Sequence, residues 1–378
     1  MSKSFDYIII GGGLAGLQLA LKFGTDRFFE QKTFAIIDPS KKDSNDKTWC
    51  FWEKENGQWD QIITKSWDKG LFFSSEKKLE LNLLPYRYKM LRSIDFYEYV
   101  HNQLKDLPNF SFINDSVDRV DEASCVVYGK KDSYSGLHVF DSRITSDFEK
   151  DEKSSTLYQH FKGWRIKTQY QTFDPEVFTM MDFRLKYKDS TSFTYVLPVS
   201  TTEALVEFTL FTPYLTGEEI YDQNLKNYID NILKIKDYQI VETEKGVIPM
   251  TDFPFHNDST PKITKIGTGG SWVKGSTGYS FKHTEKKAVQ IINNIKKSAD
   301  PGSGLINSLK RRYDSIFIDV LERNNELGEQ IFTRLYSKNE INDIFLFLDE
   351  ETVLKEDIKI MLSLYHPQFL VSFLRKIF

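Results

Sequence analysis

Residues 5–16 read FDYIIIGGGLAG, and residues 34–38 read FAIID. The first segment passes from a short apolar strand into a G-x-G-x-x-G turn and then into a helical pattern from Leu17 onward. The second segment is another apolar strand, and it ends on Asp38, roughly twenty residues past the glycines, where a carboxylate can accept hydrogen bonds from a ribose. This order of elements predicts a doubly wound α/β domain that binds a dinucleotide.

Each position of this predicted cradle has a physical role. Gly11 permits the tight turn, Gly13 lets the backbone approach a pyrophosphate, and Gly16 lets the helix lie close to the strand. The helix begins at Leu14 and Ala15, where free backbone amides and the helix dipole favour phosphate binding.

Composition narrows the possible classes of protein. The chain has 378 residues, enough for two domains, and its formal net charge of −4 gives no electrostatic case for nucleic acid as a partner. The six histidines and the two cysteines, Cys50 and Cys125, lack the spacing of a metal site or redox motif, so we expect no metal. Aromatic residues make up 15% of the chain, which suits either a pocket for a large apolar ligand or ordinary core packing.

The sequence pattern changes along the chain. Strand and helix patterns alternate up to about residue 145, period-2 segments between residues 158 and 211 predict a mostly antiparallel sheet, and residues 301–378 read as helices. Residues 262–267 read as a strand that returns to the nucleotide-binding sheet. We therefore expect a discontinuous dinucleotide-binding domain (1–60, 86–145 and 260–300), a mostly β-sheet domain (61–85 and 146–259) and a C-terminal helical region (301–378).

The last segment, residues 360–378, is strongly apolar and has an amphipathic pattern. It is either a surface that dips into a membrane or a terminal helix packed on the core. No stretch is long enough to span a bilayer. We expect a cytoplasmic protein that is peripheral to the cytoplasmic face of the membrane.

Seven further segments, taken together in their order and spacing, resemble the lycopene cyclases, flavoproteins that close the ends of linear carotenes into rings. They are NDKTWCFW (45–52), QHFKGW (159–164), MDFR (181–184), YVLP (195–198), LVEFT (205–209), GVIPMT (246–251) and STGY (276–279). The resemblance covers roughly residues 5–290. It implies a bound FAD that is active when reduced, NAD(P)H as reductant, and conversion of lycopene or a related acyclic carotenoid to β-carotene by way of γ-carotene.

The same resemblance assigns the acidic position of the family's Glu-x-Thr motif to Glu207. Strand alternation places Leu205, Glu207, Thr209 and Phe211 on one face. From the residues alone this face is either solvated or the lining of an apolar cavity, and the motif favours the cavity. We therefore predict Glu207 as the catalytic acid and its three neighbours on this face as substrate-pocket residues.

Cyclisation needs an acid that protonates a terminal alkene, so that the neighbouring double bond attacks the carbocation before a ring proton leaves. Burial in an apolar pocket raises the pKa of a glutamic acid in the required direction. Trp49, Phe51 and Trp52 are candidate pocket residues whose rings can stabilise the cation, with core packing as their alternative role. A reduced flavin nearby adds negative charge in a low-dielectric site. Either Glu207 or the flavin takes the final proton, and the reaction has no net redox change.

Asp182, in the MDFR segment, is a second candidate carboxylate. It either tunes Glu207 and holds the substrate domain against the flavin, or forms a structural pair with Arg184.

A second cofactor segment follows residue 265. Its predicted cofactor-binding residues are Gly267, Gly269, Thr277 and Gly278, followed by a helix start. Thr268 stands where related aromatic hydroxylases usually have an aspartate, which counts against a hydroxylase. Arg92 precedes a helical pattern and is either a phosphate ligand or a surface residue.

Two other classes remain as alternatives. One is a flavin-dependent monooxygenase, halogenase or prenyl reductase that acts on a lipophilic substrate. The other is a non-catalytic protein that binds a nucleotide or carries a carotenoid. Consumption of NAD(P)H in each turnover would distinguish the redox enzymes from a cyclase.

Overall fold

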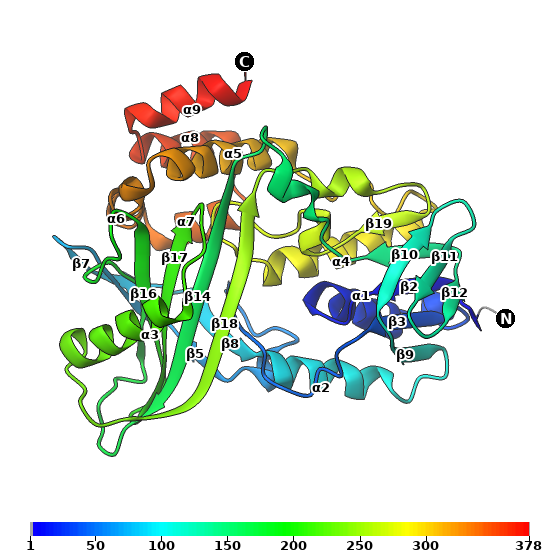
Figure 1. Ribbon diagram of the computed structural model, residues 1–378, viewed down its shortest axis with the longest axis horizontal. Helices are drawn as coiled ribbons and strands as arrows, with labels where there is room; N and C mark the ends of the chain where they lie inside the picture. The colour runs from blue at the N-terminus through cyan, green and yellow to red at the C-terminus, as the bar shows by residue number, and fades with distance from the viewer. Residues whose placement is uncertain (1–2, 378) are drawn as a thin grey trace.

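The computed structural model describes residues 3–377 and has two large β-sheets joined by helices (Figure 1). All neighbouring strands of the first sheet are parallel. In spatial order they are β19 (Ile263–Lys265), β13 (His138–Asp141), β2 (Tyr7–Ile10), β3 (Phe34–Asp38) and β9 (Phe110–Asn114). The predicted return of residues 262–267 to this sheet is confirmed, because β19 pairs with β13.

Both faces of the parallel sheet are covered, which is why its strands are apolar without alternation. Ile9, Phe34 and Ile36 pack in a core with three helices, α1 (Leu14–Thr25), α2 (Ser93–Leu104) and α4 (Phe281–Lys296). Ile8 and Ile10 pack on the other face, in a core with a smaller sheet. The strands of that smaller sheet are β1 (Lys3–Ser4), β12 (Ser133–Ser135), β11 (Val126–Gly129) and β10 (Val117–Asp121).

The second large sheet has seven strands and is mostly antiparallel, with one parallel pair, β15 and β6. In spatial order its strands are β18 (Gln239–Thr251), β14 (Thr156–Lys167), β17 (Glu203–Thr212), β16 (Thr191–Ser200), β15 (Val177–Asp182), β6 (Lys69–Phe73) and β7 (Lys78–Asn82). The antiparallel character is as predicted, but the sequence analysis did not identify β18. That strand lies at the edge of the sheet, where Pro249 costs no ladder hydrogen bond on its open side.

The two faces of the seven-stranded sheet have different neighbours. One face buries Trp164, Val206 and Phe208 against α3 (Glu218–Asn227) and the π-helical turn Tyr228–Ile232. The other face packs on the C-terminal helices and on a three-stranded antiparallel sheet. The strands of this third sheet are β4 (Thr48–Glu53), β8 (Arg87–Arg92) and β5 (Lys65–Trp67). The division of the chain into domains stays a prediction.

The helices predicted for the C-terminal region are present. They are α5 (Ser308–Arg323), α6 (Gly328–Lys338), α7 (Ile341–Leu348), α8 (Leu354–Ser363) and α9 (Pro367–Ile377). Ile318, Phe332, Phe345 and Ile360 bury them in the core of the seven-stranded sheet. Within residues 3–377 no helix combines the length and the apolar character needed to cross a bilayer.

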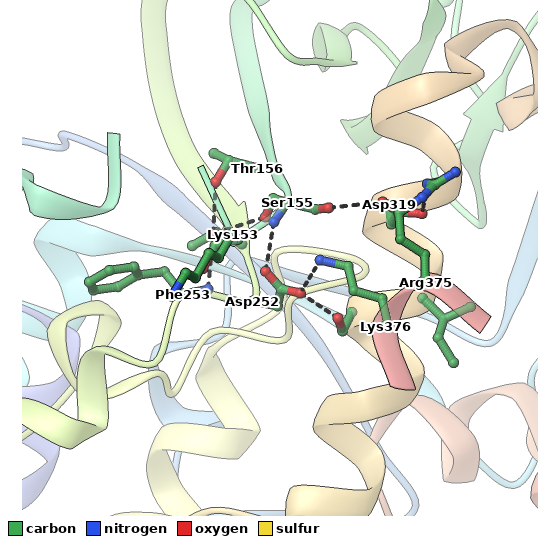
Figure 2. Close-up of polar contacts among 12 residues, drawn as sticks. Lys153, Ser155, Thr156, Asp252, Phe253, Asp319, Arg375 and Lys376 are labelled. Carbon is green, nitrogen blue, oxygen red and sulfur yellow. Dashed lines mark hydrogen bonds and ion pairs between the residues drawn. The ribbon is translucent and has the colours of Figure 1, made fainter. Parts of the chain in front are cut away.

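Helix α9 is attached to the protein through its polar side (Figure 2). Arg375 Nη1 lies 2.6 Å from Asp319 Oδ2, and Lys376 Nζ lies 2.7 Å from Asp252 Oδ2. Ser155 joins both acids, because its amide donates to Asp252 and its hydroxyl donates to Asp319. Phe369 of this helix packs against the core, but Leu370, Val371, Phe373 and Leu374 are exposed on its other side.

Candidate active site

The glycines of the first cradle meet the physical demands that the motif predicts. Gly11 has φ +100°, and a Cβ there would lie 2.0 Å from Ser142 Oγ. A Cβ on Gly16 would lie 2.0 Å from the carbonyl oxygen of Gly11, so strand and helix could not approach. Gly13 caps the N-terminus of α1 without a side-chain hydrogen bond, and a Cβ there would meet nothing within 4 Å. The space in front of the amides of Leu14 and Ala15 is therefore open.

The second glycine segment lies against the first. Gly267 has φ +61°, and a Cβ there would lie 3.0 Å from the Cβ of Ala15. A Cβ on Gly269 would lie 2.3 Å from the carbonyl oxygen of Arg143. The fold thus brings the two glycine segments together at the carboxyl ends of β2, β13 and β19, where doubly wound folds bind their ligands.

Asp38 and Arg92 take different places around this cradle. The two carboxylate oxygens of Asp38 accept from the amides of Gly12 and Ser40, over 2.6 and 2.7 Å, beside a cavity of about 550 Å³ that Tyr97 also lines. Arg92 does not line that cavity, and its Nη2 donates to Glu242 over 3.0 Å. The contacts of Asp38 with a ribose and of Arg92 with a phosphate stay predictions.

A second cavity, of about 240 Å³, lies between the seven-stranded sheet, β4 and the start of α4. Residues far apart in the sequence meet there. The lining includes Trp49 and Cys50 from β4, Gln159 and Phe161 from β14, Tyr195 and Leu197 from β16, Leu205 and Glu207 from β17, Glu244 and Ile248 from β18, and Thr277, Gly278 and Tyr279 before α4. Gln159 Oε1 and Thr277 Oγ1 are buried and have no hydrogen-bond partner within the described chain.

Glu207 lies on β17 in the wall of this cavity. Its side chain is partly exposed where it borders the cavity, and the surrounding protein desolvates the carboxyl group, which raises its pKa well above the ordinary value, with a further rise from the charge of Glu244. Thr209 Oγ1 donates to Glu207 Oε1 over 2.8 Å, which lowers the pKa by less than burial raises it. The carboxyl group therefore stays protonated at a pH where an exposed glutamate is charged.

A second glutamate at this site, Glu244, was not predicted from the sequence. Glu244 lies on β18, buried at 6% exposure, and Gly163 of β14 is the register partner of both Glu244 and Glu207. Thr48 Oγ1 donates to Glu244 Oε2 over 2.6 Å. Burial raises the pKa of Glu244 as well. The signal for this residue was present, since Glu242, Glu244, Gly246 and Ile248 alternate toward the GVIPMT segment.

The aromatic wall of the cavity differs in part from the prediction. Trp49 and Leu205 line it. Thr209 does not line the cavity, but its hydroxyl group donates a hydrogen bond to Glu207. The other predicted pocket residues, Phe51, Trp52 and Phe211, do not line this cavity, and their side chains are buried in the core. Phe51 stacks on Phe281 at 4.3 Å between ring centroids, Trp52 stacks on Phe345 at 4.4 Å, and Phe211 packs edge-to-face on Phe193 at 5.2 Å. The rings that line the cavity and were not predicted are Tyr88, Phe161, Tyr195, Tyr279 and Phe281.

Asp182 does not line the cavity that Glu207 lines. Its carboxylate is fully buried, accepts from the Tyr228 hydroxyl over 2.6 Å, and pairs with Arg184. Tyr228 belongs to the core that covers the opposite face of the sheet, together with Val206. These contacts match the alternative structural role, a pair with Arg184, and the catalytic role of Asp182 stays a prediction.

No group of three or more histidine, cysteine or acidic side chains with the arrangement of a metal site occurs in residues 3–377.

Solved structures with the same fold are flavoproteins of low sequence identity. A geranylgeranyl bacteriochlorophyll reductase-like protein from Thermoplasma acidophilum has a TM-score of 0.63 at 12% identity, over 98% of both chains. A flavoprotein/dehydrogenase from Cytophaga hutchinsonii has a TM-score of 0.62 at 10% identity, over 95% of this chain and 99% of that one. A flavin-dependent brominase has a TM-score of 0.59 at 12% identity, over 96% of this chain and 94% of the brominase chain. The fold defines the chain as structurally similar to the FAD-dependent oxidoreductases.

Sequence places the chain more narrowly. Residues 6–375 match the family described as lycopene cyclase protein. The chain therefore belongs to the lycopene cyclase family, an enzyme family, and the resemblance seen in the sequence is confirmed. No curated protein matches the chain.

Proposed function

We propose that this protein is a lycopene β-cyclase, an isomerase that closes the linear ψ ends of lycopene into β-rings without net oxidation or reduction. The observation that carries the proposal is the environment of Glu207. Its buried carboxyl group has a raised pKa and lines a cavity with six aromatic side chains. A protonated carboxyl group in an apolar, aromatic cavity is what protonation of an alkene requires.

The residues of the two glycine segments fit FAD. The open space before Gly13 and the free amides of the first turn of α1 suit a pyrophosphate, and Asp38 suits the adenosine ribose. The unpartnered Gln159 and Thr277 lie where the second cavity meets the start of α4 and suit a polar ring edge. When bound and reduced, for which we propose NAD(P)H as the source of electrons, FAD supplies negative charge beside the cavity.

The chain's own residues perform the proton chemistry in this proposal. The Glu207 carboxyl proton moves to a carbon of the terminal alkene, the adjacent double bond supplies the electron pair of the new ring bond, and a ring C–H proton then passes to the Glu207 carboxylate, which restores the acid. Thr209 fixes the orientation of Glu207 through its hydrogen bond. Trp49, Phe161 and Tyr195 exclude water and present ring faces to the positive charge.

Removal of the acid tests the proposal. Glu207→Gln keeps the shape of the side chain and removes the proton, so we expect β-ring formation to fall by about 10²-fold or more, which is typical of a lost general acid. Glu203→Gln is the matched control, because Glu203 lies on the same strand and pairs with Arg165. Normal β-carotene production by purified, FAD-loaded Glu207→Gln protein would overturn the assignment.

The fold is shared with a reductase-like protein and a brominase, so a redox reaction on a lipophilic substrate is the second candidate. The two candidates differ in stoichiometry. A cyclase forms many rings for each equivalent of reductant, whereas a reductase, monooxygenase or halogenase consumes one equivalent in each turnover. Anaerobic turnover with a limiting reductant, followed by product analysis, separates them.

We further propose that the outer face of α8 and α9 rests on the cytoplasmic face of a membrane, from which a hydrocarbon substrate can be taken. Helix α9 is inverted relative to an ordinary surface helix, because Ser372 and the ion-paired Arg375 and Lys376 face the protein. Exposed apolar side chains cover the outside of both helices. They are Val353, Leu354, Ile358, Leu362, Tyr365, Leu370, Val371, Phe373 and Leu374. Such a patch suits the headgroup and acyl boundary of a bilayer, and Lys355 on α8 is exposed beside it, whereas Lys359 pairs with Asp343.

A further inference from the structure

We propose that Glu207 and Glu244 share one proton across Gly163, and that Glu244 is the positioning residue that keeps this proton on Glu207. This inference rests on the proposed function for the role of Glu207 as an acid. The pairing itself follows from the geometry of three neighbouring strands.

Gly163 lies between the two glutamates in the sheet. It is the register partner of Glu207 on one side and of Glu244 on the other. A Cβ at this position would lie 3.1 Å from Glu244 Cγ and 3.6 Å from Glu207 Cβ. Because the glycine has no side chain, the side chains of the two glutamates are neighbours over β14, and each affects the pKa of the other.

The hydrogen bonds of the pair are complete only if one proton lies between them. Thr209 donates to Glu207 and Thr48 donates to Glu244, so each carboxyl group already accepts one bond from the wall. Glu244 Oε1 is buried and has no donor among residues 3–377. A protonated Glu207 supplies that donor, whereas two ionised carboxylates would repel each other and leave this oxygen without one.

The groups around the pair do not compete for this proton. Cys50 on β4, Tyr88 on β8, Tyr195 on β16 and Tyr279 before α4 face it, and burial raises the pKa of each, so they stay neutral near pH 7. The nearby charged residues are already paired, Arg92 with Glu242 and, at the rim, Lys47 with Asp46.

The pair has a consequence for the proposed chemistry. When Glu207 releases its proton, two adjacent carboxylates remain in a dry cavity next to the positive charge of the substrate. Their charge stabilises the cation and favours prompt return of a proton to the pair after ring closure. Glu244 acts through Glu207 in this scheme and need not contact the reacting carbon.

Glu244→Gln tests the inference, because the amide keeps the shape but donates to Glu207 and favours its carboxylate. In infrared spectra of the FAD-loaded protein without substrate, we expect a protonated-carboxyl band, sensitive to D₂O, that is present in wild type at pH 7. The band should be lost in Glu207→Gln and should titrate at lower pH in Glu244→Gln. The alkaline limb of cyclisation against pH should move down by about one pH unit or more in Glu244→Gln, a tenfold change in the protonated fraction at a given alkaline pH.

Glu244→Asp is the second variant, in which the acid is retained but withdrawn by one methylene group. We expect the titration to shift in the same direction by a smaller amount. Identical band titration and pH profile in wild type and in either folded Glu244 variant would overturn the inference. A different result would contradict the proposed function but not the inference about the pair. In that case wild type would form no β-rings, while the infrared band would still depend on both glutamates.

Discussion

Thr48 and Glu244 join two segments that are 196 residues apart, because the Thr48 hydroxyl donates to Glu244 Oε2 over 2.6 Å. Thr48 begins β4, which carries Trp49 and Cys50 into the cavity wall. Glu244 lies on the edge strand of the other sheet. One hydrogen bond thus connects the aromatic wall of the cavity to the carboxyl pair.

Loss of this hydrogen bond should impair both stability and activity. Thr48→Val removes the donor and leaves a buried acceptor unsatisfied, at a cost of about 1–3 kcal/mol in unfolding free energy. We expect ring formation to fall by about tenfold, since 1.4 kcal/mol of lost positioning corresponds to that factor. Thr48→Ser keeps the hydroxyl and is the control, and equal activity of the valine and serine variants would contradict the prediction.

The carboxyl pair makes stability depend on pH in a defined direction. Folding raises the pKa of Glu207 and of Glu244, so the folded chain holds a proton that the unfolded chain releases. This contribution to stability is complete below the unfolded pKa, about 4.3, and is lost as pH rises through the raised value. The double variant Glu207→Gln, Glu244→Gln should therefore lose less stability than wild type between about pH 5 and 8. Urea denaturation at a series of pH values measures this, and parallel curves would refute it.

FAD binding should depend on Gly13, although substitution of this glycine should not destabilise the FAD-free protein. A Cβ on Gly13 meets nothing within 4 Å, so Gly13→Ala should leave the melting temperature of the FAD-free protein nearly unchanged. The same methyl group would project into the space assigned to the pyrophosphate, and we expect FAD affinity to fall by about tenfold or more. Titration of the FAD-free protein with FAD measures the affinity. Unchanged affinity would place the phosphates elsewhere.

Membrane binding should depend on the outer face of α9. Leu370 and Leu374 are 54% and 55% exposed, and replacement of both by serine removes apolar surface worth about 1.5–3 kcal/mol for each fully inserted side chain. We expect binding to liposomes that contain anionic lipid to weaken by about tenfold or more. Leu137→Ser is the control, since Leu137 is 69% exposed and lies before β13, away from this face. Unchanged liposome binding, or a change in oligomeric state instead, would contradict the proposed surface.

The nucleotide cradle could be predicted because its information is local. The glycines, the strand before them and Asp38 lie within 34 residues, and each is required by backbone geometry that the sequence pattern expresses directly. The strand that carries Glu207 was likewise predictable from its alternation. It is buried because other elements cover both faces of the seven-stranded sheet.

Other parts of the site depend on packing between distant segments. Strand β18 contains charged residues, Gly246 and Pro249, which are depleted in strands, so it was not recognised despite its alternation, and Glu244 was missed with it. Phe51 and Trp52 lie on opposite faces of β4, and neither borders the cavity. The cavity borders Trp49 and Cys50, which are nearer the start of the strand. A sequence pattern shows which residues are apolar but not which of them face a cavity.

The most direct test of the account is anaerobic incubation of the FAD-loaded protein with lycopene in liposomes made in D₂O, with limiting reductant and mass analysis of the carotenes. We predict β-carotene that gains one deuterium for each ring closed, because the Glu207 proton exchanges with solvent before it is transferred, together with many rings for each equivalent of reductant. Unlabelled rings would contradict Glu207 as the acid. Oxygenated, halogenated or hydrogenated products, formed with one equivalent of reductant each, would contradict the assignment as a cyclase.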